Sequence, residues 1–318
     1  MLKEEFDNII ADMQNAKDIY GNRFAMDSII ISDAKNKYQH YFIEEKNLHE
    51  IRSISKLIIA LCYGILICDM RIKYKGKRIS LDTKIWSIIK DKVTIENKDN
   101  ISKLQKITLK HLFTNTPGYD KQLLFQADIK DIPPETFLHF LCNEPLIYSP
   151  GEHFLYSNAA AFILSVVFQE ITGENMSDFA NAQIFSRLGI TNFFWKNYGN
   201  YCAGATGLYL YNNDLHKIGT LFIQQGFWND SQVISKEWIK KIITPHYIII
   251  EDYNIVGVSP RYAYGLFMWI CKNGDYFIQG SGGQYLLVSP KKNIVLTALG
   301  HIEDIQIANK YLAMFLEC

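Results

Sequence analysis

The sequence predicts an α+β fold in which one antiparallel sheet is flanked by helices and carries an inserted, mainly helical lobe. Strand-like segments lie near both ends of the chain, at 26–43 and 264–299, whereas the sequence between 85 and 225 is mainly helical in pattern. An N-terminal hairpin and C-terminal strands pair most economically in one sheet, so the helical middle is expected to be an insertion. The expected boundaries are 1–318 for a single domain, about 1–70 and 205–318 for its α/β lobe, and about 71–204 for its helical lobe.

The N-terminal part combines an amphipathic helix, a hairpin and one very apolar segment. Residues 3–20 carry apolar side chains near helical spacing, which predicts an amphipathic helix. The segments 26–32 and 38–43 flank a polar turn and predict a β-hairpin. The run 57–68 is apolar throughout, which predicts a helix buried on all sides. This run is too short to span a bilayer.

The middle of the chain is predicted to be helical because caps and breakers delimit short periodic segments. One helix is expected to start at Thr108 and to be broken by the Thr-Pro-Gly-Tyr sequence at 116–119. The proline pair at 133–134 opens a helix over 136–142, where proline fits the first turn. A longer helix over 159–171 is closed by a glycine.

The C-terminal part changes from helix to strand. Residues 214–225 are expected to be helical, and Ser235 is expected to cap a further helix. The Asn-Gly dipeptide at 273–274 is a strong hairpin signal between two apolar runs. The remaining expected elements are strands at 264–270, 276–279, 285–289 and 294–299 and a closing amphipathic helix at 305–316.

Composition excludes several classes of function. The net charge is zero, with 33 basic and 33 acidic residues, which argues against nucleic acid or an anionic membrane as a partner. The six cysteines are scattered without a Cys-x-x-Cys pair, and the eight histidines show no metal-binding spacing, so we expect no metal site and no cofactor. The first residues carry charges of both signs and do not resemble a secretory signal, so we expect a cytoplasmic protein.

Ser53 and Lys56 are the first candidate catalytic residues. They stand three apart at the start of the apolar helix, where such a pair shares one face. Desolvation would lower the pKa of Lys56, and a neutral amine could then activate the Ser53 hydroxyl as a nucleophile. The alternative is a helix cap followed by a lysine that reaches solvent. The same spacing also occurs at Ser32/Lys35, Ser87/Lys90 and Ser289/Lys292, none of which opens a buried helix.

Two further motifs follow in the chain. Tyr156 and Asn158 lie on a loop just before the helix at 159–171, so the tyrosine can project inward. The alternatives are a core tyrosine with a satisfied hydroxyl and an asparagine that caps the helix. The glycine-rich segment 280–284 interrupts the C-terminal strands, and glycines there allow a substrate to approach a strand edge closely.

In this order the three motifs resemble those of the serine β-lactamase and penicillin-binding-protein superfamily, in its class C β-lactamase-like branch. The resemblance extends from about residue 26 to the end of the chain and implies a β-lactamase/transpeptidase-like fold. Three other segments support it: Ser149-Pro150-Gly151-Glu152 is similar to the family's Pro-Gly turn, 107–118 to its "LLTHTSG" segment, and 204–208 with 213–215 to its "GL…DL" segment.

The resemblance implies a role for each motif. Ser53 would be the acylated nucleophile and Lys56 its base, Tyr156 would pass a proton to the leaving group, and Asn158 would position the substrate. The backbone N–H groups of Ser53 and Gln284 would form the oxyanion hole, for which preorganised donors are typical.

The third motif departs from the family pattern. Ser281, followed by Gly282 and Gly283, stands where the family usually has lysine or histidine, a cation that helps to bind a substrate carboxylate. The Gly-x-Gly-Gly-Gln form is closer to 6-aminohexanoate-oligomer hydrolase and esterase-like members. Asn115 and Pro117 also replace the family's histidine and serine in the "LLTHTSG" segment.

Three hypotheses about function follow. The first is a serine hydrolase that cleaves a small amide or ester, with β-lactams or D-alanyl peptides as alternative substrates. The second is a catalytically silent homologue that binds a peptide or cell-wall fragment; it becomes the better hypothesis if Ser53, Lys56 and Tyr156 do not converge. The third is an α/β-hydrolase with Ser281 as nucleophile and His301 as base, but Gln279 occupies the first glycine position of the required Gly-x-Ser-x-Gly elbow.

Overall fold

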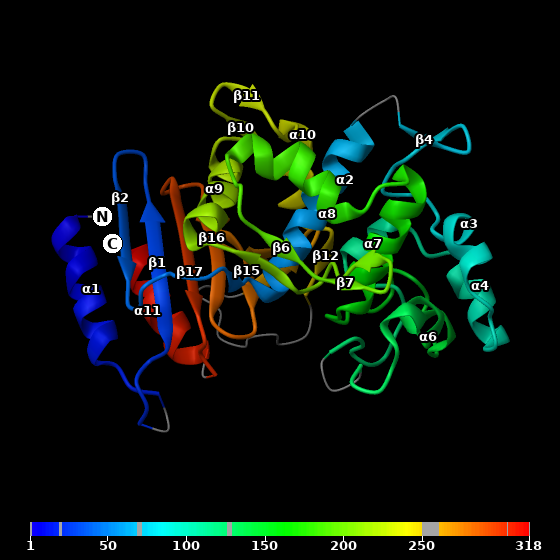
Figure 1. The fold of residues 1–318 in the computed structure, drawn as a ribbon, viewed down its shortest axis with the longest axis horizontal. Helices are drawn as coiled ribbons and strands as arrows, with labels where there is room; N and C mark the ends of the chain where they lie inside the picture. The colour runs from blue at the N-terminus through cyan, green and yellow to red at the C-terminus, as the bar shows by residue number, and fades with distance from the viewer. Residues whose placement is uncertain are drawn as a thin grey trace.

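The computed structural model describes residues 2–18, 21–68, 72–125, 129–249, 261–303 and 305–317. The strands of the main sheet lie on one side of the molecule, and most of the short helices from the middle of the chain lie on the other (Figure 1). The two chain ends lie near each other beside the sheet. None of the described helices has the length and hydropathy of a membrane span.

The main sheet has eight strands, and every neighbouring pair is antiparallel. The N-terminal hairpin joins the C-terminal strands directly, with Ile30 opposite Thr297, which confirms the expected single sheet. In spatial order the strands are β12 (Tyr247–Ile248), β13 (Arg261–Tyr264), β14 (Trp269–Cys271), β15 (Tyr276–Gly280), β16 (Gln284–Ser289), β17 (Ile294–Gly300), β1 (Met26–Ser32) and β2 (Lys37–Tyr41).

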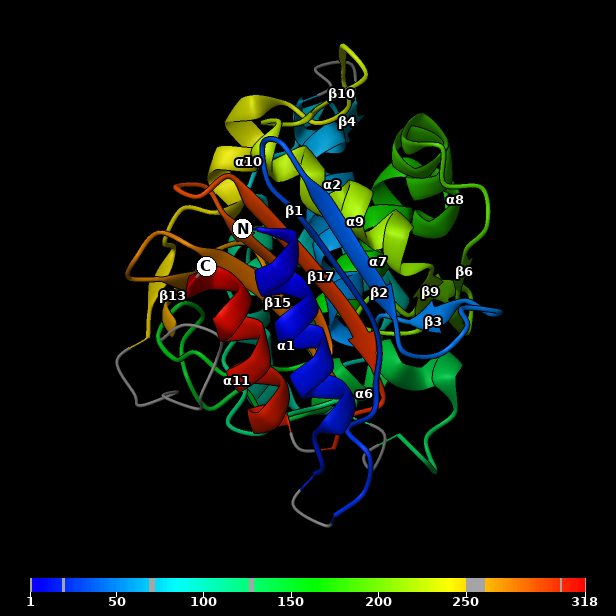
Figure 2. The ribbon, with the colours of Figure 1, turned by 90° about the vertical axis from the view of Figure 1, so that its left-hand side faces the viewer.

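Helices cover both faces of this sheet. Helices α1 (Lys3–Asn15) and α11 (Ile305–Glu317) pack together in front of one face, as Figure 2 shows. Helix α9 (Asn212–Ile223) packs on the other face, against β1, β16 and β17. Gly219 permits this approach, because a Cβ there would lie 2.7 Å from Val295 Cγ1.

Helix α2 (Ser55–Cys68) lies between the sheet and the helices from the middle of the chain (Figure 1). All of its residues from Ser55 to Gly64 are buried, which confirms burial on all sides over that stretch, but not at the end of the helix, where Cys68 is exposed. The other helices are α3 (Trp86–Ile89), α4 (Ile101–Leu104), α5 (Leu109–Phe113), α6 (Phe137–Asn143), α7 (Ala159–Thr172), α8 (Met176–Ala180) and α10 (Lys236–Ile242).

Short strands complete the fold and link it to the start of α2. Strands β3 (His49–Glu50), β9 (Leu208–Leu210) and β6 (Phe194–Trp195) form a small sheet. The two-stranded pairs are β4 (Lys73–Tyr74) with β5 (Lys77–Arg78), β7 (Asn197–Tyr198) with β8 (Tyr201–Cys202), and β10 (Phe227–Trp228) with β11 (Ser231–Gln232).

Two expected elements differ from the structure: one helix ends earlier, and one strand is divided into two. The N-terminal helix ends at Asn15, and residues 19 and 20 of the expected helix lie outside the described part of the chain. The single strand expected over 264–270 is wrong, because the chain reverses between β13 and β14. Gly265 N–H donates to Met268 C=O at 2.8 Å, and Phe267 adopts a φ of +60°.

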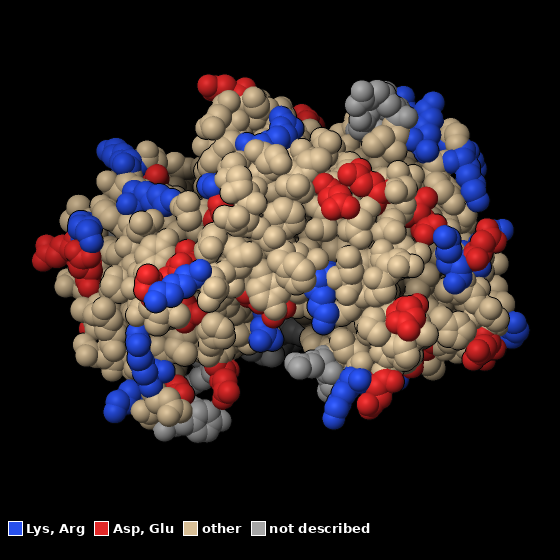
Figure 3. Space-filling model, in the orientation of Figure 1, with Lys and Arg blue, Asp and Glu red and all other residues tan. Residues whose placement is uncertain are grey.

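Charges of both signs are interspersed over the face of the molecule that Figure 3 shows. This distribution agrees with the zero net charge of the chain.

Candidate active site

Ser53 lies in a single 3₁₀ turn, Arg52–Ile54, directly before α2. The strand on its N-terminal side is anchored, because Ile51 N–H donates to Leu208 C=O at 2.9 Å. On its C-terminal side the Ser55 hydroxyl donates to Arg52 C=O at 2.5 Å, and Arg52 itself has a φ of +48°. The backbone that carries the candidate nucleophile is therefore fixed from both directions.

Lys56 is completely buried beneath Ser53. Its Nζ donates to Ser53 Oγ at 3.1 Å, to Asn158 Oδ1 at 2.8 Å and to the Ala205 carbonyl at 3.4 Å. No ion pair found among the described residues involves this lysine. Burial lowers the pKa of Lys56, and interaction with Tyr156 offsets part of the shift. In its neutral form the amine keeps two hydrogens, which can go to Asn158 Oδ1 and the Ala205 carbonyl, and its lone pair can then accept from the Ser53 hydroxyl.

The alternative of a solvent-reaching lysine is wrong for Lys56, which has no exposed surface. The lysines of the other three Ser-x-x-Lys pairs, Lys35, Lys90 and Lys292, are all exposed. Burial thus distinguishes the pair at Ser53 from the others.

Tyr156 also lines the site and lies on the loop before α7. The centre of its ring lies 4.9 Å from Lys56 Nζ. The ring stacks on Trp269 with a centroid distance of 6.0 Å and an interplanar angle of 21°. Strand β14 of the main sheet therefore orients a tyrosine that belongs to the helical side of the molecule.

Asn158 joins Lys56 to a second loop. Its Oδ1 accepts from Lys56, and its Nδ2 donates to Leu124 C=O at 2.9 Å. The residue stands at the start of α7, but its side chain makes no capping hydrogen bond. The helix-cap alternative is therefore wrong for this side chain, which is directed into the site.

Asn115 and Ser157 support this loop, and sequence reasoning assigned neither of them to the site. The buried Asn115, with a φ of +53°, accepts from Ser157 N–H at 3.4 Å and donates to the Tyr264 hydroxyl at 3.2 Å. The Ser157 hydroxyl donates to Leu123 C=O at 3.1 Å. Asn115 was visible in the sequence only as a departure from the family's "LLTHTSG" pattern.

A cavity of about 790 Å³ opens over these groups, a size suited to a small-molecule ligand. Ser53, Tyr156 and Asn158 line it together with Ser281, whereas Lys56 lies beneath Ser53. Ser281 is exposed in the turn between β15 and β16. The structure thus brings five of the predicted site residues together.

Gly282, Gly283 and Gln284 do not line this cavity. The Gln284 side chain is buried, where its Nε2 donates to Gly282 C=O at 3.0 Å and to Gly300 C=O at 2.6 Å. Gln284 lines an adjoining cavity of about 500 Å³ instead. Its backbone N–H as an oxyanion donor therefore stays a prediction.

Arg261 contributes a cation that sequence reasoning missed. Its guanidinium carbon lies 4.2 Å from the Trp269 ring centre, and one terminal nitrogen donates to Gln279 Oε1 at 3.4 Å. Its Nε is buried and makes no hydrogen bond within the described part of the chain. Burial lowers the pKa of Arg261, while Tyr156 and other neighbours act in the opposite direction. Arg261 reaches this position because β13 pairs with β14, with Arg261 opposite Cys271. Sequence spacing does not reveal this pairing.

The alternative nucleophile and base, Ser281 and His301, line different cavities. His301 Nδ1 is instead hydrogen-bonded to Asp27 Oδ2 at 2.8 Å. The geometry therefore does not support an α/β-hydrolase site at these residues.

Comparison with known proteins gives one family match and many structural matches. A family model described as Beta-lactamase matches residues 19–225, about two thirds of the chain. No curated protein matches. Among solved structures, a protein from Bacillus anthracis described as a 6-aminohexanoate-dimer hydrolase is similar, at 19% identity and a TM-score of 0.72 over 92% of this chain and 78% of that one.

Two other solved structures are similar over nearly their whole length. A penicillin-binding protein from Bacillus halodurans has 16% identity and a TM-score of 0.72, with 98% of each chain covered. EstCE1, described as a hydrolase with promiscuous acyltransferase activity, has 14% identity and a TM-score of 0.75, with 99% of this chain and 98% of that chain covered. At these identities the likeness shows the fold.

Proposed function

Because the chain belongs to the beta-lactamase family, we propose that it is a serine hydrolase that cleaves a small amide or ester through an acyl-enzyme on Ser53. One observation carries the proposal: the fully buried Lys56 amine lies 3.1 Å from Ser53 Oγ, and no carboxylate among the described residues pairs with it. A lysine desolvated in this way is suited to act as a general base.

The proposed reaction has two steps. The neutral Lys56 amine takes the proton from Ser53 Oγ while that oxygen attacks the substrate carbonyl, and the resulting oxyanion is stabilised by the N–H groups of Ser53 and Gln284. Tyr156 gives its hydroxyl proton to the leaving amine or alcohol and takes the proton held by Lys56 in return, which leaves Ser53 acylated and Lys56 neutral. A water molecule then attacks the acyl carbonyl while the same base system takes one of its protons, and that proton passes to Ser53 Oγ as the acyl–oxygen bond breaks, which releases the acid and restores Ser53.

The charges around the cavity support a substrate with a negatively charged group. Among the described residues, the lining contains Arg52, Lys196 and Arg261 against a single carboxylate, Glu50. Arg261 can supply the positive charge that the neutral Ser281 lacks, because a guanidinium binds a carboxylate through two parallel hydrogen bonds. We therefore propose an anionic amide or ester as the preferred substrate class.

The similar solved structures are compatible with cleavage of either an amide or an ester bond. One is described as a 6-aminohexanoate-dimer hydrolase, and another as a hydrolase with promiscuous acyltransferase activity. The hydrogen bond between Lys56 and Ser53 supports catalysis over the alternative of a silent binding protein.

Labelling with a fluorophosphonate probe tests the nucleophile, and a panel of p-nitrophenyl esters, nitrocefin and short amide oligomers tests the bond cleaved. Wild type is expected to be labelled, and Ser53→Ala is expected to lose both label and turnover. Ser87→Ala is a matched control, since Ser87 also precedes a lysine by three residues but lies in a pair whose lysine is exposed. Labelling that survives in Ser53→Ala would contradict the proposal.

A further inference from the structure

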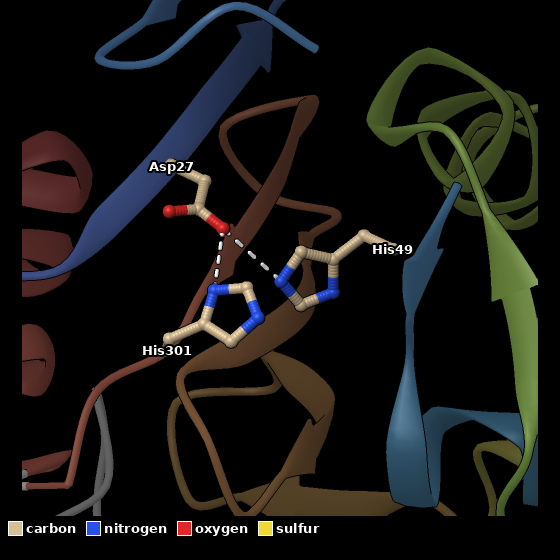
Figure 4. Close-up of side chains that lie close together, drawn as sticks. All are labelled: Asp27, His49 and His301. Atoms are coloured by element: carbon tan, nitrogen blue, oxygen red, sulfur yellow. Dashed lines mark hydrogen bonds and ion pairs between the residues drawn. The ribbon is translucent and has the colours of Figure 1, made fainter. Parts of the chain in front are cut away.

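A second cluster of chemically active side chains lies outside the proposed active site, at Asp27, His49 and His301. They come from β1, from β3 and from the residue that follows β17 (Figure 4). Their three donor atoms lie within 4.8 Å of one another. His301 Nδ1 is 2.8 Å and His49 Nε2 is 3.2 Å from the same oxygen, Asp27 Oδ2.

The tautomer of His49 is fixed by its backbone contact. His49 Nδ1 lies 2.8 Å from the carbonyl oxygen of Glu50, which can only accept, so Nδ1 carries the hydrogen. In the neutral ring the lone pair then lies on Nε2, a buried atom with no hydrogen-bond partner among the described residues. The His49 and Asp27 side chains are only 11% and 14% exposed. Asp27 Oδ2 thus accepts from His301, while the Nε2 lone pair of a neutral His49 faces the same oxygen at 3.2 Å, and a metal cation between them would satisfy both atoms.

The donor set indicates which cation fits. Two imidazole nitrogens and one carboxylate oxygen suit Zn²⁺, whereas Mg²⁺ and Ca²⁺ prefer oxygen ligands alone. Tetrahedral Zn²⁺ with bonds of about 2.0–2.1 Å separates its ligands by about 3.3 Å. The observed separations from Asp27 Oδ2 of 2.8 and 3.2 Å require only small side-chain movements. The contact of His49 with the Glu50 carbonyl is the outer-shell hydrogen bond that commonly orients a zinc-bound histidine.

The surroundings provide access and a favourable field. The cluster lines the cavity of about 500 Å³ that adjoins the proposed active site. The same cavity is lined by the carboxylates of Glu44, Glu45 and Glu50, so with Asp27 the described lining has four carboxylates against two cations, Lys46 and Arg52. The negative excess attracts a divalent cation, and the cavity leaves a fourth coordination position for water.

We propose that Asp27, His49 and His301 bind one Zn²⁺ ion, with a water molecule as fourth ligand. On binding, His301 Nδ1 releases the proton that it now donates to Asp27, and His49 binds through the lone pair on Nε2. Sequence reasoning expected no metal site because it searched for local spacing, whereas these residues meet only when β1 pairs with β17, as in the register Met26 opposite Gly300. The ion would link the main sheet to β3, whose first residue, His49, precedes Ser53 by four positions.

Zinc titration of the full chain after treatment with a chelator tests the site. Wild type is expected to bind one Zn²⁺ per chain by calorimetry, to rise in Tm on zinc addition, and to give the intense visible spectrum of low-coordinate Co²⁺ when cobalt replaces zinc. His301→Ala is expected to fold, because His301 is 69% exposed, and to lose about 100-fold or more in affinity. Asp27→Asn is expected to weaken binding in the same direction.

His139→Ala is the matched control, since His139 Nε2 also faces a carboxylate, Glu96, at 3.4 Å but does not belong to the three-residue cluster. Its zinc affinity is expected to equal that of wild type. Absence of one-to-one binding to wild type, or equal affinity in His301→Ala, overturns the proposal and leaves an ordinary histidine–carboxylate network. Neither outcome depends on hydrolase activity, so failure of this proposal is distinguishable from failure of the proposed function.

Discussion

At the scale of single residues, the central feature is a lysine that is buried without a carboxylate partner among the described residues. Burial disfavours the charged form of Lys56, which lowers the free energy of unfolding. The lysine stands where a neutral amine can act as a base.

The lowered pKa of Lys56 predicts a specific pH dependence of stability. Below the folded-state pKa the lysine is protonated in both states, and above about 10.5 it is neutral in both. Between these limits the unfolded chain binds a proton that the folded chain does not, so the free energy of unfolding rises with pH. Urea unfolding at a series of pH values should show a steeper rise for wild type than for Lys56→Met. The control Lys90→Met, at an exposed lysine, should keep the wild-type slope, and a wild-type slope in Lys56→Met would contradict the shift.

Removal of the Tyr156 hydroxyl alone should separate catalysis from packing. Tyr156→Phe keeps the ring that stacks on Trp269 but loses the group that transfers the proton. We expect kcat to fall by about 10²–10⁴ with an unchanged Tm, as is typical for loss of a general acid–base group. Tyr209→Phe, at another tyrosine that lines the cavity, should retain activity. A normal kcat in Tyr156→Phe would exclude the proposed proton transfer.

Replacement of Arg261 should change substrate preference. Arg261→Gln removes the guanidinium from the cavity, so KM for an anionic ester should rise about tenfold or more, since a charge-assisted hydrogen bond contributes about 1.5–3 kcal/mol. KM for a neutral ester with the same leaving group should stay the same. Equal effects on the two esters would show that Arg261 acts through packing on Trp269 instead.

At the scale of elements, the position of Ser53 depends on how α2 packs. Trp238 of α10 packs against this helix, and its indole N–H donates to Ala60 C=O at 2.8 Å. Gly64 makes this approach possible, because a Cβ there would lie 2.3 Å from Trp238 Cδ1. A buried tryptophan has little freedom to move away.

Gly64→Ala is therefore expected to destabilise the protein by about 1–3 kcal/mol through overpacking, although alanine has the better helix propensity by about 1 kcal/mol. Trp238→Phe makes room, so the same substitution should cost less in that background. Chemical unfolding of both single variants and the double variant measures the coupling. Additive effects on the free energy of unfolding would show that Gly64 is not required for the contact with Trp238.

Sequence patterns predicted the elements that have strong local signals and missed those determined by tertiary contacts. The hairpin at 26–43 and the helix at 159–171 were predictable from alternation and from the closing glycine, whose φ is +74°. The reversal between β13 and β14 was not, because its turn is made of apolar residues. Its conformation depends on distant contacts, such as the hydrogen bond from Leu266 N–H to Ile242 C=O.

At the scale of the whole molecule, one sheet joins the two ends of the chain and places two sites close together. The family resemblance predicted which side chains approach Ser53, but the support from Asn115 and the cation from Arg261 come from pairings that local sequence does not specify. The same holds for Asp27 and His301, which are far apart in sequence and adjacent only in the folded sheet. Glu50, Arg52 and Tyr209 line both cavities, so the proposed hydrolase site and the proposed zinc site are neighbours.

The central claim is that the reaction passes through an acyl group on Ser53, and mass spectrometry after brief incubation with a p-nitrophenyl ester tests it most directly. Wild type should gain the mass of one acyl group, which peptide mapping should place on Ser53, and the group should disappear as p-nitrophenol release ceases. Ser53→Ala should gain none. An adduct mapped to another residue, or an equal adduct on Ser53→Ala, would contradict the account.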